Sequence, residues 1–257
     1  RVRASDGKLL ETWTGATSAL GILSAMGRIL VAGETTPGNL YMIDPSQPAG
    51  AVTTVASTLG SGAYGIAFDG ARVWTANAGI PASVSIVTPG ATIPWTVTNV
   101  TTGFTGLRGA LYDGANVWAT DVTGTSVPGA LRKLDANGNI LATATVGVVP
   151  VIPVFDGNNI WVPNYNDSSV TVVRASNASV LATLTGNGLD FPYAAAFDGQ
   201  RVLVTARNGN SVALWKAADL TTIGNFPTGA ATNPNGACSD GIHFWVALGG
   251  TNQLARF

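Results

Sequence analysis

The chain has 257 residues, with 13 Lys and Arg against 14 Asp and Glu, so its formal net charge is −1. Charged residues make up 11% of the sequence, against about 25% in a typical soluble domain, and hydrophobic residues make up 46%. This composition excludes an intrinsically disordered chain, a coiled coil and a nucleic-acid-binding protein of the basic-patch kind.

A four-residue motif recurs along the whole chain. Its clearest copy is Phe68-Asp69-Gly70-Ala71, and variants stand in residues 112–115, 155–158, 197–200 and 239–242, with a degenerate copy in residues 25–28. A bulky apolar residue, usually Trp, follows each Asp by five positions. Six copies of about 43 residues account for the sequence, and this period is typical of propeller blades.

Each copy contains four short runs rich in Val, Thr, Ile and aromatic residues. In the fourth copy we expect strands over residues 152–155, 159–163, 169–174 and 180–185. Asp-Gly between two apolar runs is the strongest short-range signal for a β-hairpin. Four strands per copy at this period predict an all-β, six-bladed β-propeller with four-stranded antiparallel blades.

The two ends of the chain are predicted to share a blade. Residues 3–15 align without gaps on residues 174–186, which form the fourth strand of a blade, whereas the C-terminal copy ends after its third strand. We therefore predict one domain, 1–257, whose ring is closed when the N-terminal strand 1–15 pairs with the C-terminal blade 235–257. Closure would remove two free sheet edges.

The sequence also resembles a known group of propellers. Trp74-Thr75-Ala76-Asn77 and Trp161-Val162-Pro163-Asn164 resemble the Tyr/Trp-Val-Thr-Asn signature of YVTN-type bacterial propellers. The run Phe-Asp-Gly-x-x-Ile/Val-Trp is similar to NHL-like and streptogramin-lyase-like repeats. The resemblance implies a six-bladed propeller, and for the lyases it implies histidine and acidic residues around a divalent metal. This chain has a single histidine, His243, in a turn expected on the opposite face, which argues against a lyase site.

Candidate ligand-binding residues come from two repeat positions. One lies eight residues after the Asp, at the end of the second strand, and the other lies five residues before it, at the start of the first strand. Both positions should share a face, because antiparallel pairing brings the start of one strand beside the end of the next. Together with the residues that follow the second strands, these positions give Glu34, Tyr64, Asn77, Arg108, Asp121, Asn164, Tyr165, Tyr193, Arg207 and Asn235.

Aromatic and polar side chains mixed on one surface favour a binding role. The leading hypothesis is a non-enzymatic, extracellular or cell-surface binding or scaffold propeller with a protein or glycan partner, or with copies of itself as partners. Nucleic-acid binding and membrane insertion are not expected, and no signal peptide is present in the chain. No catalytic residue, metal ligand or cofactor is predicted, although Glu34 and Asp121 could contribute to a calcium site. Two alternatives remain open: a metal-assisted lyase or hydrolase, and a structural subunit of a filament, phage or surface appendage.

Overall fold

A computed structural model describes residues 1–257. The fold is the all-β, six-bladed propeller that the repeats predict, with 23 strands in five four-stranded sheets and one three-stranded sheet. The chain forms two compact units, Arg1–Asp121 with Lys133–Leu141, and Val122–Arg132 with Ala142–Phe257. The structure contains no helix long and apolar enough to span a membrane.

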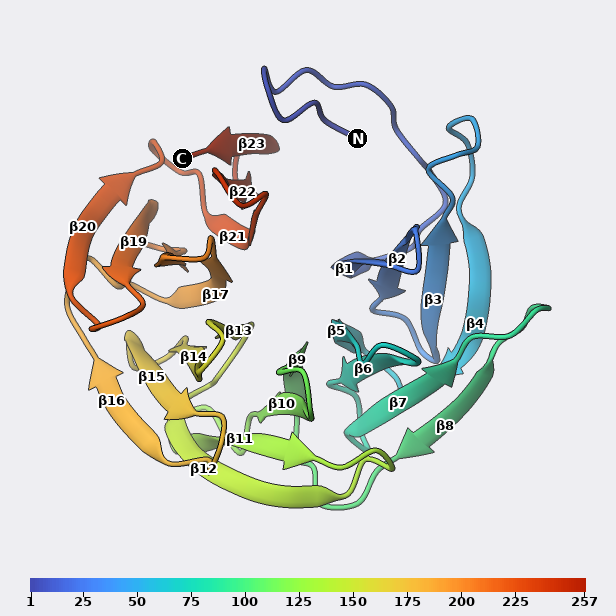
Figure 1. The fold of residues 1–257 in the computed structure, drawn as a ribbon, viewed down its shortest axis with the longest axis horizontal. Helices are drawn as coiled ribbons and strands as arrows, with labels where there is room; N and C mark the ends of the chain where they lie inside the picture. The colour runs from blue at the N-terminus through green and yellow to red at the C-terminus, as the bar shows by residue number, and fades with distance from the viewer. The chain divides into compact units, whose positions relative to one another are not determined.

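The first unit contains blades 1 and 2 and the first two strands of blade 3 (Figure 1). The strands of blade 1 are β1(Ala19–Ala25), β2(Arg28–Gly33), β3(Gly38–Ile43) and β4(Thr53–Leu59). Those of blade 2 are β5(Ala63–Phe68), β6(Val73–Asn77), β7(Ser83–Thr88) and β8(Thr96–Val100). Blade 3 begins with β9(Leu107–Tyr112) and β10(Val117–Asp121). Its remaining strands, β11(Pro128–Leu134) and β12(Ile140–Val148), carry residues of both units.

The second unit contains blades 4, 5 and 6. The strands of blade 4 are β13(Val154–Phe155), β14(Asn159–Asn164), β15(Ser169–Arg174) and β16(Val180–Leu184). Those of blade 5 are β17(Pro192–Phe197), β18(Arg201–Ala206), β19(Ser211–Lys216) and β20(Thr222–Pro227). Blade 6 consists of β21(Pro234–Ser239), β22(Phe244–Leu248) and β23(Gln253–Arg256).

The core lies between neighbouring blades. In the second unit, Trp161 and Val172 of blade 4 pack with Val202 and Trp215 of blade 5, and the rings of Trp161 and Trp215 are 6.3 Å apart. Because a middle strand is covered on both faces, its sequence is an apolar run rather than an alternation. This packing explains much of the low charge of the chain.

The Asp-Gly motif forms the turn between the first and second strands. The motif glycines of blades 2 to 6 have φ between 88° and 101°, a region that L-residues rarely adopt. A Cβ added at any of these glycines would meet no atom within 4 Å. Backbone conformation, rather than crowding, therefore selects glycine at this position.

The first strand of blade 4 is shorter than expected. The predicted strand covers residues 152–155, whereas β13 covers Val154–Phe155 alone. Ile152 pairs instead with the neighbouring blade, since its N–H donates to the carbonyl of Tyr193 and its carbonyl accepts from Ala195. Pro153 lies between these two pairings and has no N–H to donate.

The N-terminal segment contains turns and isolated bridges. Residues 1–15 form no strand, and the last sheet has three strands. The segment makes two isolated bridges, an antiparallel one between Val2 and Leu9 and a parallel one between Thr14 and Ala51. Thr14 exchanges hydrogen bonds with Gly50 and Val52, which flank Ala51. Pairing of this segment with blade 6 stays a prediction.

Candidate functional site

An aromatic and cationic cluster stands at one end of blades 4 and 5. It consists of Tyr165, Phe191, Tyr193 and Arg207, all half-buried, and we call it the aromatic cluster. The ring centroids of Tyr165 and Phe191 are 4.7 Å apart in an edge-to-face arrangement, and those of Tyr165 and Tyr193 are 6.2 Å apart. The guanidinium carbon of Arg207 lies 5.4 Å from the ring centroid of Tyr193. The two edge-to-face ring contacts and the cation–π contact all have favourable geometries.

Strand pairing assembles this cluster in the way that the sequence predicts. Pro192 at the start of β17 pairs with Ala206 at the end of β18, so the residues that follow them, Tyr193 and Arg207, stand at the same end of the sheet. The N–H of Arg207 donates to the carbonyl of Phe191 over 3.1 Å. Phe191 has a φ of 50°, so its backbone takes a sharp turn directly before the strand. The sequence did not single out Phe191, because it lies outside the two repeat positions.

The N–H of Tyr165 fixes the remaining ring of the cluster. It donates to the carbonyl of Val149 over 2.9 Å, which holds the residue directly after β14 against the segment that leads into blade 4. The cluster therefore rests on backbone hydrogen bonds at each of its loops.

A related pair occurs in the first unit. The guanidinium carbon of Arg108, on β9, lies 5.0 Å from the ring centroid of Tyr64, on β5. Both residues hold the same repeat position in neighbouring blades, and both are half-buried. The structure thus brings these two predicted residues together.

Three predicted residues are fully buried. Asn77, Asp121 and Asn164 have no exposed surface. The amide of Asn77 donates to the hydroxyls of Ser83 and Ser85, both on the adjacent strand β7. Such contacts are internal to a blade, and a ligand that binds the folded surface does not reach these side chains.

Asp121 and Asn164 likewise have structural contacts. The Oδ1 atom of Asp121 accepts hydrogen bonds from the N–H groups of Thr105 and Gly106, over 3.0 and 2.9 Å. The amide of Asn164 donates to Ser169 and Thr171, and its buried Oδ1 has no hydrogen-bond partner. Sequence position placed these residues at the end of the second strand correctly. It did not reveal that their side chains turn into the blade.

The two remaining predicted residues join no cluster. Glu34 is exposed directly after β2. Asn235, on β21, is half-buried, and its backbone carbonyl accepts a hydrogen bond from the hydroxyl of Thr205 over 2.9 Å. Its side-chain Oδ1 is buried without a partner.

The residues present do not fit the metal site that the lyase resemblance implies. No group of three or more His, Cys, Asp or Glu side chains is placed to hold a metal ion. The single histidine, His243, contacts Asp240 at 3.8 Å in an Asp-Gly turn. The carboxylate of Asp121 accepts hydrogen bonds from two backbone N–H groups, and neither Asp121 nor Glu34 belongs to a group of three or more such side chains.

The opposite ends of the strands carry a hydrogen bond that repeats from blade to blade. Oδ1 of each motif Asp accepts hydrogen bonds from two backbone N–H groups of its turn. In blades 2, 3, 4 and 6, Oδ2 also accepts the indole N–H of the Trp five residues later. The four Asp–Trp pairs are Asp69–Trp74, Asp113–Trp118, Asp156–Trp161 and Asp240–Trp245, at 2.7–2.8 Å. Blade 5 has Leu203 in place of Trp, and there Arg201 donates to Oδ2 of Asp198 over 2.7 Å.

These hydrogen bonds lower the pKa of Asp69 and of Asp240. The indole of Trp245 and the turn N–H groups of His243 and Ile242 lower the pKa of Asp240 from 3.8 to about 2. For Asp69, burial would raise the pKa. Hydrogen bonds from Arg72 and Trp74 outweigh burial and hold the pKa below its ordinary value.

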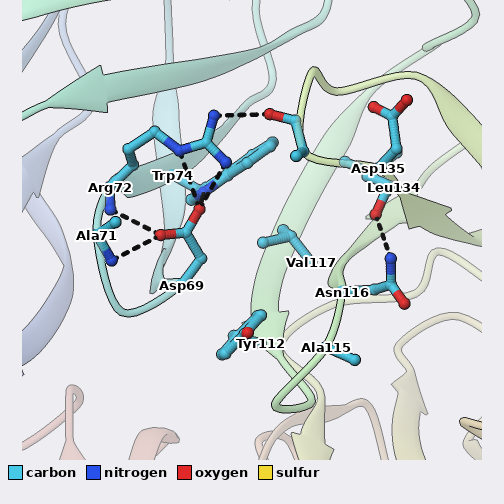
Figure 2. A pocket seen from close by; sticks show the side chains of 11 residues that line it. Asp69, Ala71, Arg72, Trp74, Tyr112, Ala115, Asn116, Val117, Leu134 and Asp135 are labelled. Carbon is cyan, nitrogen blue, oxygen red and sulfur yellow. Dashed lines mark hydrogen bonds and ion pairs between the residues drawn. The ribbon is translucent and has the colours of Figure 1, made fainter.

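Two grooves lie at this end of the strands. One, of about 260 Å³, separates blades 2 and 3, and Figure 2 shows Arg72 reaching across it from Asp69. The other, of about 590 Å³, separates blades 4 and 5. The first is bridged by a hydrogen bond of 2.7 Å from Nη1 of Arg72 to the carbonyl of Ala136.

Comparison with solved structures finds several propellers of the same form. Kuenenia stuttgartiensis hydrazine synthase aligns with a TM-score of 0.83 and 17% identity, covering 100% of this chain and 88% of that chain. Streptogramin B lyase aligns with a TM-score of 0.72 and 14% identity, covering 96% and 81%. These likenesses show the fold alone. The propeller of a nidogen/laminin complex aligns with a TM-score of 0.66 and 16% identity, covering 82% and 81%.

No family model and no curated protein matches the sequence. The likeness to streptogramin B lyase supports the streptogramin-lyase-like propeller architecture that the repeats indicate. At 14% identity, this likeness does not assign any residue of this chain to a lyase site.

Proposed function

We propose that this chain is a non-enzymatic binding propeller that acts outside the cell or at a surface and binds a partner protein through the aromatic cluster. The observation that carries the proposal is the packing of Tyr165, Tyr193 and Arg207 at one end of blades 4 and 5. Tyr and Arg are enriched among the residues that dominate the energy of protein–protein interfaces. Two tyrosines held edge to face present apolar area at a low cost in conformational entropy.

The low charge of the chain supports the same proposal. With 11% charged residues, the protein has few groups that must stay hydrated when a surface is covered. Large apolar side chains are exposed on several strands, among them Ile22, Leu141 and Leu181. The nidogen/laminin likeness supports the proposal only as an example of a propeller in a protein complex.

Photo-crosslinking tests this function in the cells that produce the protein. A photoreactive phenylalanine analogue replaces Tyr165 in one variant and the exposed Thr96 of β8 in a control variant. We expect one partner to be crosslinked from position 165 but not from position 96. Adding Arg207→Ala and Tyr193→Ala to the first variant should abolish the crosslink, while the melting temperature changes little.

A glycan array of neutral and acidic oligosaccharides separates the alternative ligand class. Binding to a glycan that is lost in the Tyr193→Ala/Arg207→Ala variant would overturn the protein-partner proposal in favour of a glycan-binding propeller. Equal crosslinking from positions 165 and 96, or crosslinking that survives the double substitution, would overturn the role of the aromatic cluster.

A further inference from the structure

The two grooves are equivalent places in the repeat. Each is bounded on one side by the Asp turn of a blade, Asp69 or Asp156. On the other side, each is bounded by the segment that follows the third strand of the next blade. Ala136 follows Asp135, whose N–H closes a hairpin by donating to the carbonyl of Asn139. Ala217 follows Lys216, whose N–H closes the equivalent hairpin by donating to the carbonyl of Thr221. The grooves therefore differ in their side chains and not in their architecture.

In the groove between blades 2 and 3, the chain supplies its own guanidinium. Arg72 lies three residues after Asp69 and donates to Oδ2 of Asp69 from both Nε and Nη2, over 3.1 and 2.9 Å (Figure 2). Its Nη1 donates to the carbonyl of Ala136, 64 residues away, over 2.7 Å. The guanidinium carbon also lies 5.1 Å from the ring of Trp74. Carboxylate and carbonyl acceptors thus hold a planar fork in the groove.

In the groove between blades 4 and 5, the equivalent residue is too short to do this. Asn159 takes the place of Arg72, and its amide donates only a long hydrogen bond of 3.4 Å to Oδ2 of Asp156. The hydrogen bonds to Asp156 from Asn159 and Trp161 include no ion pair, and no side chain of blade 4 donates to the carbonyl of Ala217, the counterpart of Ala136. The groove is more than twice as large, about 590 against 260 Å³.

The cations at this groove have anionic neighbours. Arg201 donates to Asp198 over 2.7 Å, and its guanidinium lies 5.3 Å from the ring of Phe244 in blade 6. Lys216 is near enough to Asp219 to contribute to lowering the pKa of that carboxyl. Asp156 is the carboxylate that lines this groove, and no cationic side chain is paired with it.

We propose that the groove between blades 4 and 5 binds a guanidinium group of a ligand, an arginine side chain, which takes the position that Arg72 fills between blades 2 and 3. The guanidinium donates to Oδ2 of Asp156 and to the carbonyl oxygen of Ala217, the counterpart of Ala136. The site lies at the end of β14 opposite to Tyr165, so it is distinct from the aromatic cluster and independent of the function proposed for it.

An NMR titration tests the proposal on the whole chain. The probes are arginine capped at both ends and capped citrulline, which has nearly the same shape without the charge. We expect capped arginine to shift the indole N–H resonance of Trp161, the donor to Asp156, saturably, and to leave that of Trp118 in place. Citrulline should bind at least about tenfold more weakly, because charge-assisted hydrogen bonds are the stronger ones. No shift at Trp161, equal binding of the two probes, or stronger binding of capped aspartate overturns the proposal.

Two variants exchange the Arg and Asn side chains between the equivalent positions of the two grooves, and each gives a further test. Asn159→Arg should fill the groove as Arg72 does and remove the response of Trp161 to capped arginine. Arg72→Asn should open the groove between blades 2 and 3, so that capped arginine then shifts the indole of Trp74 and raises the melting temperature of this variant. If Asn159→Arg folds and still binds capped arginine at the wild-type affinity, the groove is not the site. If it fails to fold, the wild-type titration and Arg72→Asn decide the question.

Sedimentation velocity identifies the source of the arginine. Self-association of the wild type that is lost in Asn159→Arg assigns it to a second copy of this chain. A monomeric wild type that binds capped arginine assigns it to a different protein or peptide.

Discussion

The indole nitrogen of Trp161 donates a hydrogen bond of 2.7 Å to Oδ2 of Asp156, five residues earlier in the chain. Trp161 is fully buried and packs against Trp215 of the next blade. The bond therefore links the turn that begins the second strand to the contact between two blades. It gives one reason for the recurrence of both residues at this fixed spacing.

Replacing Trp161 with Phe should destabilise the protein more than replacing Trp74. In Trp161→Phe, Oδ2 of Asp156 keeps only the long bond from Asn159, and loss of a hydrogen bond to a charged group costs about 1.5–3 kcal/mol. In Trp74→Phe, Arg72 still donates to Asp69 twice. Because both substitutions remove the same volume, urea unfolding of the pair isolates the hydrogen bond. An equal or larger loss in Trp74→Phe would contradict this account.

The Asp240–Trp245 bond should affect both the pH dependence of stability and the titration of the Asp240 carboxyl. The pKa of Asp240 is lowered to about 2, chiefly by the Trp245 indole, so the folded state favours the carboxylate. The resulting stability is fully present above the unfolded pKa, near 3.8, and is lost as pH falls through about 2. In a ¹³C NMR titration, Trp245→Phe should move the midpoint of the Asp240 carboxyl up towards 3.8. Trp161→Phe serves as the control and should leave it in place; a midpoint near 2 in Trp245→Phe would assign the lowering to the turn N–H groups instead.

The sequence alone was enough to predict the propeller, because its signal is periodic. An Asp-Gly turn with a required positive φ recurs in five blades, and the apolar runs between turns have the length of strands. The strand pairing that places Tyr193 beside Arg207 followed from the same pattern. A regular repeat fixes the backbone of each blade, so the blade strands were predicted well, except that β13 is shorter than predicted and residues 1–15 form no strand.

Side-chain direction was harder to predict. Asn77 and Asn164 were expected on the surface, but serine and threonine hydroxyls on the adjacent strand draw their amides into the blade. Such partners cannot be identified from a position in the repeat. The Asp–Trp bond, by contrast, is visible in the sequence as a fixed spacing of the two residues. In the blade where Leu203 replaces Trp, Arg201 donates to the Asp instead.

Gly157→Ala should destabilise the protein, although space for the methyl group is available. The φ of Gly157 is 101°, and an added Cβ would meet no atom within 4 Å. Strain in the backbone should therefore lower the free energy of unfolding by about 1–2 kcal/mol. Gly50 has equally open surroundings without a positive φ, so Gly50→Ala should be neutral or stabilise by up to about 1 kcal/mol. Thermal unfolding of both variants measures the difference, and similar melting temperatures would show that the turn relaxes.

We expect Thr205→Val to destabilise the protein, although valine and threonine have nearly the same shape. The strand pairing of β17 with β18 is irregular between Pro192 and Ala195, and the hydroxyl of Thr205 accepts the N–H of Ala194 there over 3.0 Å. The same hydroxyl donates to the carbonyl of Asn235 in blade 6 over 2.9 Å. Thr205 and Ala194 are fully buried, so valine would leave the Ala194 N–H without a partner, at a cost of about 1–3 kcal/mol.

Thr205→Ser keeps the hydroxyl and serves as the matched control. We expect it to lose less stability than Thr205→Val in urea unfolding, although it removes a methyl group that valine retains. Hydrogen exchange at the Ala194 amide should accelerate in Thr205→Val and stay near the wild-type rate in Thr205→Ser, relative to buried amides elsewhere in blade 5. If the valine variant is as stable as the wild type and protects this amide equally, the hydroxyl does not hold blades 5 and 6 together, and apolar packing at this position is sufficient.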